Sequence, residues 1–166
     1  MLVIGIDPGT ARTGYGIVRQ SEDGSLTAVE FGVIVTDSEQ ALPQRLLRIS
    51  KNLADLLLRH RPDSGAMEKL FIREHVNTAL SVGQASGVAL LTLAEADVPA
   101  YEYSPLEVKQ AICGYGRADK TQVQEMVKAL LGLEERPSPD DAADALAVAI
   151  CHLHTAAVIS RLEAGS

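Results

Sequence analysis

Four acidic side chains stand where apolar segments of the sequence begin or end. Asp7 closes the apolar run at residues 2–7, and a turn of proline, glycine and threonine follows at once. Glu68 lies late in AMEKLF, while Asp141 and Asp144 of DDAADALAVAI are three residues apart and share a helix face. Partly buried carboxylates need an offsetting charge, and Mg²⁺ prefers such hard oxygen ligands. Two ions about 3.5–4 Å apart can stabilise both reacting oxygens of a phosphodiester.

Each acid taken alone also has an ordinary structural interpretation. Asp140 and Asp141 suit the first turn of a helix as caps or dipole partners, and we expect Asp140 to be a cap. Asp144 follows that turn among alanines, where capping fits poorly. The turn after Asp7 is compatible with a metal site, a phosphate-binding loop or a simple turn. Only the joint placement of the acids favours a metal site.

Length and composition favour one domain with a sizeable core. The chain has 166 residues, of which 46% are hydrophobic. We expect one domain over residues 1–158 and a loosely ordered tail over 159–166. The net charge of −7 argues against a nucleic-acid partner but does not exclude one, because the location of the charges matters more than their sum. No leader segment is evident and no apolar run approaches the ~18 residues of a membrane span, so we expect a cytoplasmic protein without membrane contact.

Apolar periodicity predicts an α/β fold. A deeply buried first strand at residues 2–7 precedes two more strands, joined by the Asp-Gly of a hairpin turn. Helical spacing follows and ends at Arg61-Pro62. The later elements are a strand at 65–71, a helix at 74–95, a strand at 98–103 and three helices, the last starting near 140. The order predicts a mixed five-stranded sheet, three antiparallel strands and then alternating helices and strands, with helices on both faces.

Basic and aromatic residues near the acids suit contact with a nucleic acid. Lys109 and Lys120 flank CGYGRAD, whose glycines and Arg117 predict a flexible basic loop able to follow a phosphate backbone. Phe71 comes just after the second acidic segment with Arg73 close by, where an aromatic ring could stack on an unpaired base. An ordinary solvated surface for each lysine, and core packing for Phe71, remain alternatives.

Four segments of the sequence together resemble the RuvC family of Holliday junction resolvases. These are IGIDPGTARTGYGIV, MEKLF, EVKQAICGYGRADKTQVQEMV and DAADALAVAICHLH, which occur in the family's order over about residues 2–155. The resemblance implies a ribonuclease-H-like fold and a homodimer. It implies resolution of four-way DNA junctions in recombination and repair by paired, symmetric nicks that leave 5′-phosphate and 3′-hydroxyl ends. It also implies two Mg²⁺ ions per active site, with Mn²⁺ as a substitute, and cooperation with the RuvA–RuvB branch-migration complex.

The resemblance also implies roles for individual residues. The metal-binding catalytic acids would be Asp7, Glu68, Asp141 and Asp144. The DNA-contacting residues would be Phe71, which reaches into the junction, Arg73, Lys109, Arg117 and Lys120. Along the helix at 74–95, a stripe that includes Leu80, Gly83, Gly87 and Leu90 would let a second subunit approach closely.

Other functions remain open on the same fold. A non-catalytic junction-binding protein and a ribonuclease that cuts RNA–DNA hybrids are the alternatives, because a fold does not fix a substrate. DPGTARTG is also superficially similar to the phosphate loop of actin-like sugar kinases and ATPases. Those proteins close two such domains on a nucleotide, whereas 166 residues supply one.

Overall fold

A computed structural model describes residues 1–69 and 76–164 of the chain. Its strands are β1 (Leu2–Asp7), β2 (Arg12–Gln20), β3 (Leu26–Val35), β4 (Ser64–Glu68) and β5 (Ala100–Tyr103). Within these described residues they form a five-stranded sheet in the order β3-β2-β1-β4-β5. β2 is antiparallel to both β1 and β3, whereas β4 runs parallel to β1 and β5 parallel to β4. The expected mixed sheet is confirmed, with β1 at its centre.

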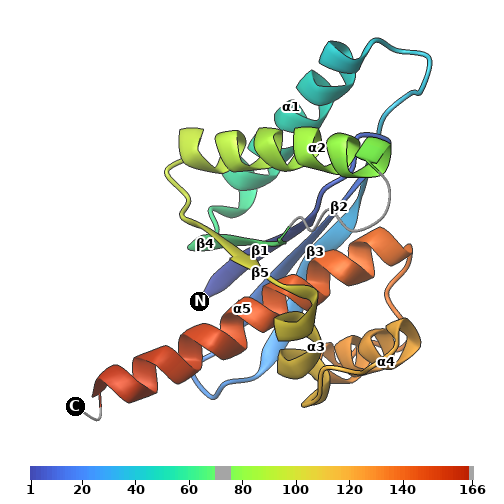
Figure 1. The fold of residues 1–166 in the computed structure, drawn as a ribbon. Coiled ribbons are helices and arrows are strands. Elements are labelled where there is room, and N and C mark those ends of the chain that lie inside the picture. Colours follow the sequence, from blue (N-terminus) through green and yellow to red (C-terminus); the bar gives the residue numbers. More distant parts are fainter. Residues whose placement is uncertain (70–75, 165–166) are drawn as a thin grey trace.

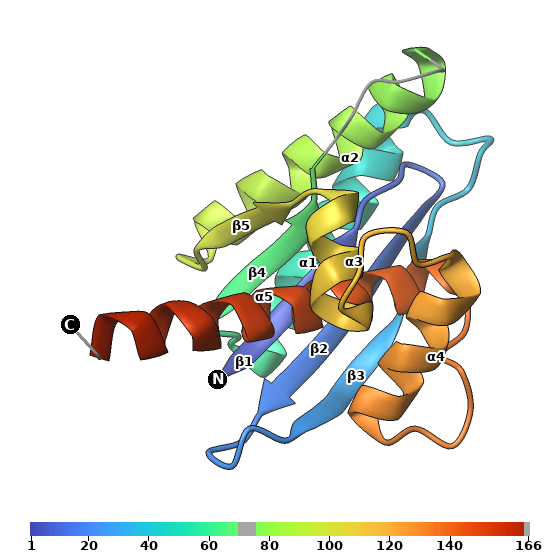
Figure 2. The same ribbon diagram turned by 60° about the horizontal axis from the view of Figure 1, so that its bottom comes forward.

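Helices cover both faces of the sheet, as the sequence predicted. The helices α1 (Leu42–His60) and α2 (Val76–Glu95) lie on one face, and α3 (Pro105–Cys113), α4 (Lys120–Leu131) and α5 (Asp140–Ala164) lie on the other (Figures 1 and 2). Neighbouring side chains of β1 alternate between the two cores: Ile4 packs with Leu53 of α1, and Val3 packs with Ile150 of α5. Burial on both faces explains why β1 is a continuous apolar run.

Some boundaries differ from those predicted. The strand expected at 65–71 ends at Glu68, and its last two positions lie outside the described residues. The final helix continues through Ala164, past the domain boundary expected at 158. Cys113 and Cys151 are free, although only Cys151 is fully buried. Across the described segments, no helix is long and apolar enough to cross a membrane.

Two glycines allow α5 to lie directly on the sheet. A Cβ on Gly5 of β1 would stand 1.9 Å from the carbonyl oxygen of Ala145, and a Cβ on Gly14 of β2 would stand 2.0 Å from that of Asp141. Such distances are far below van der Waals contact, so any other residue would push the helix away. The first turns of α5 are therefore held against the end of β1.

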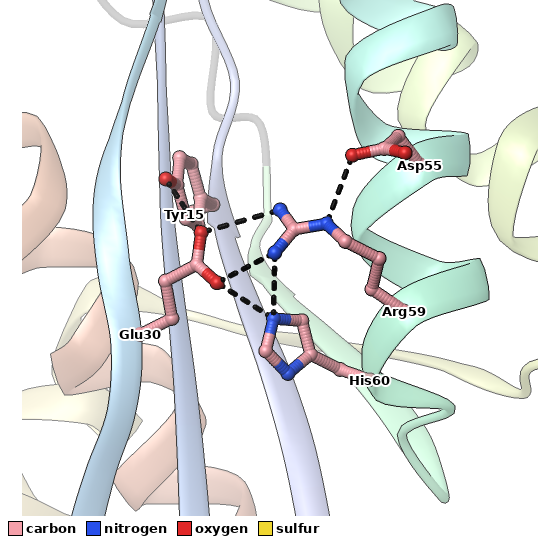
Figure 3. Close-up of polar contacts among 5 residues, drawn as sticks. All are labelled: Tyr15, Glu30, Asp55, Arg59 and His60. Carbon is pink, nitrogen blue, oxygen red and sulfur yellow. Dashed lines mark hydrogen bonds and ion pairs between the residues drawn. The ribbon is translucent and has the colours of Figure 1, made fainter.

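On the opposite face, an ion-pair cluster fastens the end of α1 to β3 (Figure 3). The Glu30 carboxylate accepts hydrogen bonds from Arg59 Nη1 at 3.0 Å, His60 Nε2 at 2.7 Å and Tyr15 Oη at 3.2 Å. Arg59 Nε also donates to Asp55 at 2.9 Å. These bonds, chiefly those from Arg59, lower the pKa of Glu30 to about 2. The cluster lies on the face that the acidic motifs do not use.

Candidate active site

The fold brings the four predicted acids to one edge of the sheet. Asp7 ends β1 and Glu68 ends β4, and these strands are parallel neighbours, so their carboxyl ends meet. Asp141 and Asp144 lie in the first two turns of α5, which the glycine contacts press onto β1 and β2. Residues far apart in the sequence thus form one acidic cluster.

The electrostatics of Asp7 show how close the other acids are. The pKa of Asp7 is raised to about 7, first by burial of its carboxylate and then by the negative charges of Asp144, Asp141 and Glu68. Nearby Lys120 opposes this rise only in part. A carboxylate that is buried beside three others is a strong candidate for holding a cation.

The pKa values of Glu68 and Asp144 are raised as well. Glu68 stands at the exposed end of β4, yet loss of water around its carboxylate and the charge of Asp144 raise its pKa, while Lys109 lowers it. Burial is also the largest cause of the raised pKa of Asp144, against which the ion pair with Lys120 acts. The cluster therefore carries more negative charge than its own lysines offset.

Cations from two elements contact the acids of α5. Lys120 Nζ lies 3.2 Å from Oδ2 of Asp140 and 3.3 Å from Oδ2 of Asp144. Asp140, which we expected to cap α5, instead accepts bonds from Lys120 and from Gln124 Nε2 at 3.0 Å, so it ties α5 to α4. Arg12 Nε donates to Oδ2 of Asp141 at 2.8 Å.

Capped helices position the two predicted lysines at the site. Ser104 caps α3 in a capping box with Glu107, and Asp119 caps α4 in a capping box with Gln122. The starts of these helices wall a pocket of about 240 Å³. It is lined by Glu68, Asp144, Lys109 and Lys120 together with Pro105, Val108, Val123 and Ala147. A larger cavity of about 520 Å³ lies at the C-terminal ends of α1 and α2, but Glu95 and Asp97 are the only acids on its lining.

Of the three remaining DNA-contact predictions, only Arg117 falls on residues that the structure describes. Phe71 and Arg73 lie outside the described residues. Arg117 is exposed in the loop between α3 and α4, and within residues 1–69 and 76–164 no ion pair joins it to an acid. Arg12 is a functional candidate that sequence reasoning missed. The sequence spacing could have indicated it: Arg12 lies two residues before Gly14, so both residues lie on the face of β2 that packs against α5.

The donor set fits a hard divalent cation, because all four predicted ligands are carboxylates, and burial together with their mutual repulsion raises the pKa of Asp7. As the side chains stand, the described part of the chain contains no group of three histidine, cysteine, aspartate or glutamate side chains arranged as ready metal ligands. Asp141 and Asp144 engage Arg12 and Lys120 instead. Holding an ion would require these two acids to exchange partners.

Comparison with known proteins identifies the family. A family model described as crossover junction endodeoxyribonuclease RuvC matches residues 3–152. The chain belongs to the RuvC family. A RuvC relative from a Roseiflexus species is 55% identical over 98% of this chain and 96% of the relative. One from Syntrophomonas wolfei is 51% identical over 100% of this chain and 96% of the relative.

Solved RuvC structures confirm the ribonuclease-H-like α/β fold. Thermus thermophilus RuvC superposes with a TM-score of 0.90 at 38% identity, over 95% of this chain and 96% of that one. A second structure, T. thermophilus RuvC in complex with a Holliday junction substrate, superposes with a TM-score of 0.88 at 35% identity and the same coverage. The RuvC fold is thus matched over nearly the whole chain.

Proposed function

We propose that this protein is a crossover junction endodeoxyribonuclease that resolves four-way DNA junctions during recombination and repair. The observation that carries the proposal is the convergence of Asp7, Glu68, Asp141 and Asp144 at one edge of the sheet in a member of the RuvC family. The complex of T. thermophilus RuvC with a Holliday junction supports the choice of substrate. The compartment of action is proposed to be the cytoplasm.

The acids are proposed to hold two Mg²⁺ ions, with Mn²⁺ as a substitute. When bound, such ions lower the pKa of water and stabilise charge on a departing oxygen, which yields 5′-phosphate and 3′-hydroxyl ends. Asp7 and Glu68 stand on adjacent strands and supply rigidly placed oxygens. Lys109 and Lys120, on the pocket wall beside Glu68 and Asp144, are placed to orient the scissile phosphate and to stabilise its added charge.

The proposal includes three further DNA contacts. Arg117 lies in the loop that joins the two lysine-bearing helices, so it is proposed to bind the backbone beside the cleaved strand. Phe71 and Arg73 follow Glu68 by three and five positions and are proposed to contact the junction. Their assignment rests on the sequence motif.

A homodimer through α2 is part of the proposal, because paired nicks require two equivalent sites. Leu80 and Leu91 are 61% and 60% exposed, and a Cβ on the exposed Gly87 between them would meet no atom within 4 Å. These three residues share one helix face. Leu90, predicted to belong to this stripe, instead packs against the core with α1. The RuvA–RuvB branch-migration complex is the proposed further partner.

The test compares three substrates: a mobile four-way junction, a linear duplex and an RNA–DNA hybrid. Wild type, Asp7→Asn and Asp97→Asn are each incubated with every substrate in Mg²⁺, in Mn²⁺ or in chelator. Asp97→Asn is the control, because it removes an exposed carboxylate outside the cluster. Paired, metal-dependent nicks in the junction alone, lost only in Asp7→Asn, are expected. Junction binding without cutting under every metal would point to a non-catalytic protein, and cutting of the hybrid alone would overturn the substrate.

A further inference from the structure

Arg12 and Asp141 form an ion pair that joins the start of β2 to the first turn of α5. Arg12 Nε lies 2.8 Å from Oδ2 of Asp141, and the two side chains are 47% and 29% exposed. The position of α5 does not require this pair, because Gly14 and the apolar core already seat the helix on β2. The bond therefore acts on the carboxylate of Asp141 itself.

The ion pair competes with the proposed role of Asp141. The oxygen that accepts the Arg12 bond is a carboxylate oxygen that a divalent ion would require. A guanidinium close to that oxygen also repels an incoming cation. Arg12 thus holds the carboxylate in a state that disfavours metal binding.

A DNA phosphate offers Arg12 a second partner. A guanidinium presents several donors in a fixed fork that matches phosphate oxygens, and Arg12 is almost half exposed at the sheet edge where the acids converge. The neighbouring lysine pair, Lys109 and Lys120, marks the same edge as the place where a phosphate backbone is expected. A phosphate of the DNA backbone can therefore replace Asp141 as the partner of the Arg12 guanidinium.

We propose that Arg12 is a positioning residue that couples DNA binding to metal binding. Without DNA it holds Asp141; when a backbone phosphate takes over its guanidinium, Asp141 is released toward the metal. The inference rests on the proposed function, in which Asp141 is a metal ligand. Such coupling is reciprocal. If DNA increases the affinity for the cation by some factor, the bound cation increases the affinity for DNA by the same factor.

The first experiment measures Mn²⁺ binding to the DNA-free, full-length protein by titration calorimetry. Arg12→Gln is expected to bind Mn²⁺ about three- to tenfold more tightly than wild type, because an exposed ion pair and one repelling charge are removed. Arg19→Gln is the matched control: it removes the same exposed side chain from the same strand, about 23 Å away at ~3.3 Å per residue. It should leave Mn²⁺ affinity unchanged, and Arg12→Lys, which keeps the charge, should stay near wild type.

The second experiment measures the coupling itself. Junction affinity is determined by fluorescence anisotropy with and without Ca²⁺ at constant ionic strength. The Ca²⁺-dependent gain should be several-fold in wild type and in Arg19→Gln, and at least halved in Arg12→Gln. Equal gains in all three proteins, or Mn²⁺ affinity in Arg12→Gln no tighter than in wild type, would overturn the coupling.

Asp7→Asn separates this inference from the function on which it rests. If Asp7→Asn loses Mn²⁺ binding while Arg12→Gln behaves as wild type, the metal site stands and the coupling fails. If Asp7→Asn and wild type bind Mn²⁺ alike, the acidic cluster is not the metal site, and the proposed function fails with the inference. Thermal unfolding of each variant verifies that it is folded.

Discussion

Gly14 lies directly beneath the backbone of Asp141, where a single added Cβ would stand 2.0 Å from the carbonyl oxygen. A glycine of the first motif thereby sets the position of an acid from the last motif, across most of the chain. The same strand carries Arg12, which contacts the side chain of Asp141. The conformation of Asp141 is thus controlled by β2 at both its backbone and its carboxylate.

Gly14→Ala is expected to displace the first turn of α5. Because the obstructing atom belongs to backbone, it cannot rotate away, and overpacking of this kind costs about 1–3 kcal/mol. Denaturant unfolding should show that loss, and junction cleavage should fall by more than the loss of folded protein explains. The control is Gly24→Asn in the β2–β3 turn, where a Cβ meets nothing within 4 Å and asparagine tolerates the positive φ. Unchanged cleavage by Gly14→Ala would show that α5 does not depend on this contact.

Removal of the Asp7 charge should stabilise the metal-free protein at high pH. The folded pKa of about 7 lies above the usual 3.8, so the folded state binds this proton more tightly than the unfolded state does. The contribution of Asp7 to stability is therefore fully present below pH 3.8 and is lost as pH rises through 7. In chelator, the Tm of Asp7→Asn should exceed that of wild type at pH 8, with the difference shrinking toward pH 4. A difference independent of pH would contradict the assigned cause.

In Mg²⁺, the Tm of wild type should exceed that of Asp7→Asn. A ligand that binds only the folded state stabilises it, by about 2.7 kcal/mol at a concentration of 100 times Kd. Wild type should therefore gain thermal stability on titration with Mg²⁺, while Asp7→Asn gains little. Asp97→Asn, which lies outside the cluster, should gain as much as wild type. An equal gain in all three proteins would place the stabilising Mg²⁺ elsewhere.

The Glu30 cluster predicts a stability change at acid pH with the opposite sign. The pKa of Glu30 is lowered from 4.5 to about 2, so its contribution is present above pH 4.5 and is lost as pH falls through 2. Glu30→Gln should lower the unfolding free energy by about 1 kcal/mol at pH 7, because partial exposure screens the ion pairs, and this effect should disappear as pH falls through 2. Mn²⁺ affinity should not change. Glu39→Gln, an exposed acid in the turn before α1, serves as the control.

Charge placed on the exposed face of α2 should separate the subunits. Leu91→Glu puts a carboxylate on the stripe formed with Leu80 and Gly87, and sedimentation should then show a monomer at concentrations where the proposed wild-type dimer is expected. Leu58→Glu, on α1 and 71% exposed in the chain, is the matched control and should remain dimeric. If Leu91→Glu sediments as wild type does, α2 is not the interface.

The sequence predicted the sheet well because its strands and turns leave strong local patterns. The apolar run before Asp7, the hairpin signal after Gln20 and the cap at Ser104 are fixed by neighbouring residues, and the structure confirms the elements they indicate. The parallel pairing of β1 with β4 then carries Asp7 to Glu68 without further information. Hydrophobic periodicity and sheet topology are sufficient to predict these features.

What the sequence did not reveal depends on contacts between distant segments. The pairing of Arg12 with Asp141 spans 129 positions, and the spacing of Arg12 from Gly14 indicates a shared face of β2 but not the partner. The sequence position of Asp140 is typical of a cap, but Lys120 and Gln124 of α4 contact its carboxylate instead. Likewise, Leu90 and Leu91 differ in role only because the rotation of α2 about its axis is set by packing on α1. Such outcomes are decided in tertiary packing rather than in the motif.

The long α5 makes the acidic cluster mechanically dependent on the far side of the molecule. Its 25 residues form a rod of about 37 Å at 1.5 Å per residue, with Asp141 and Asp144 at one tip. A tilt of only ~3° about the opposite tip would sweep those carboxylates through about 2 Å, when a misplacement of about 1 Å can cost a hundredfold in rate. Buried residues in the second half of the helix, such as Leu153, therefore help to fix the position of Asp141 and Asp144.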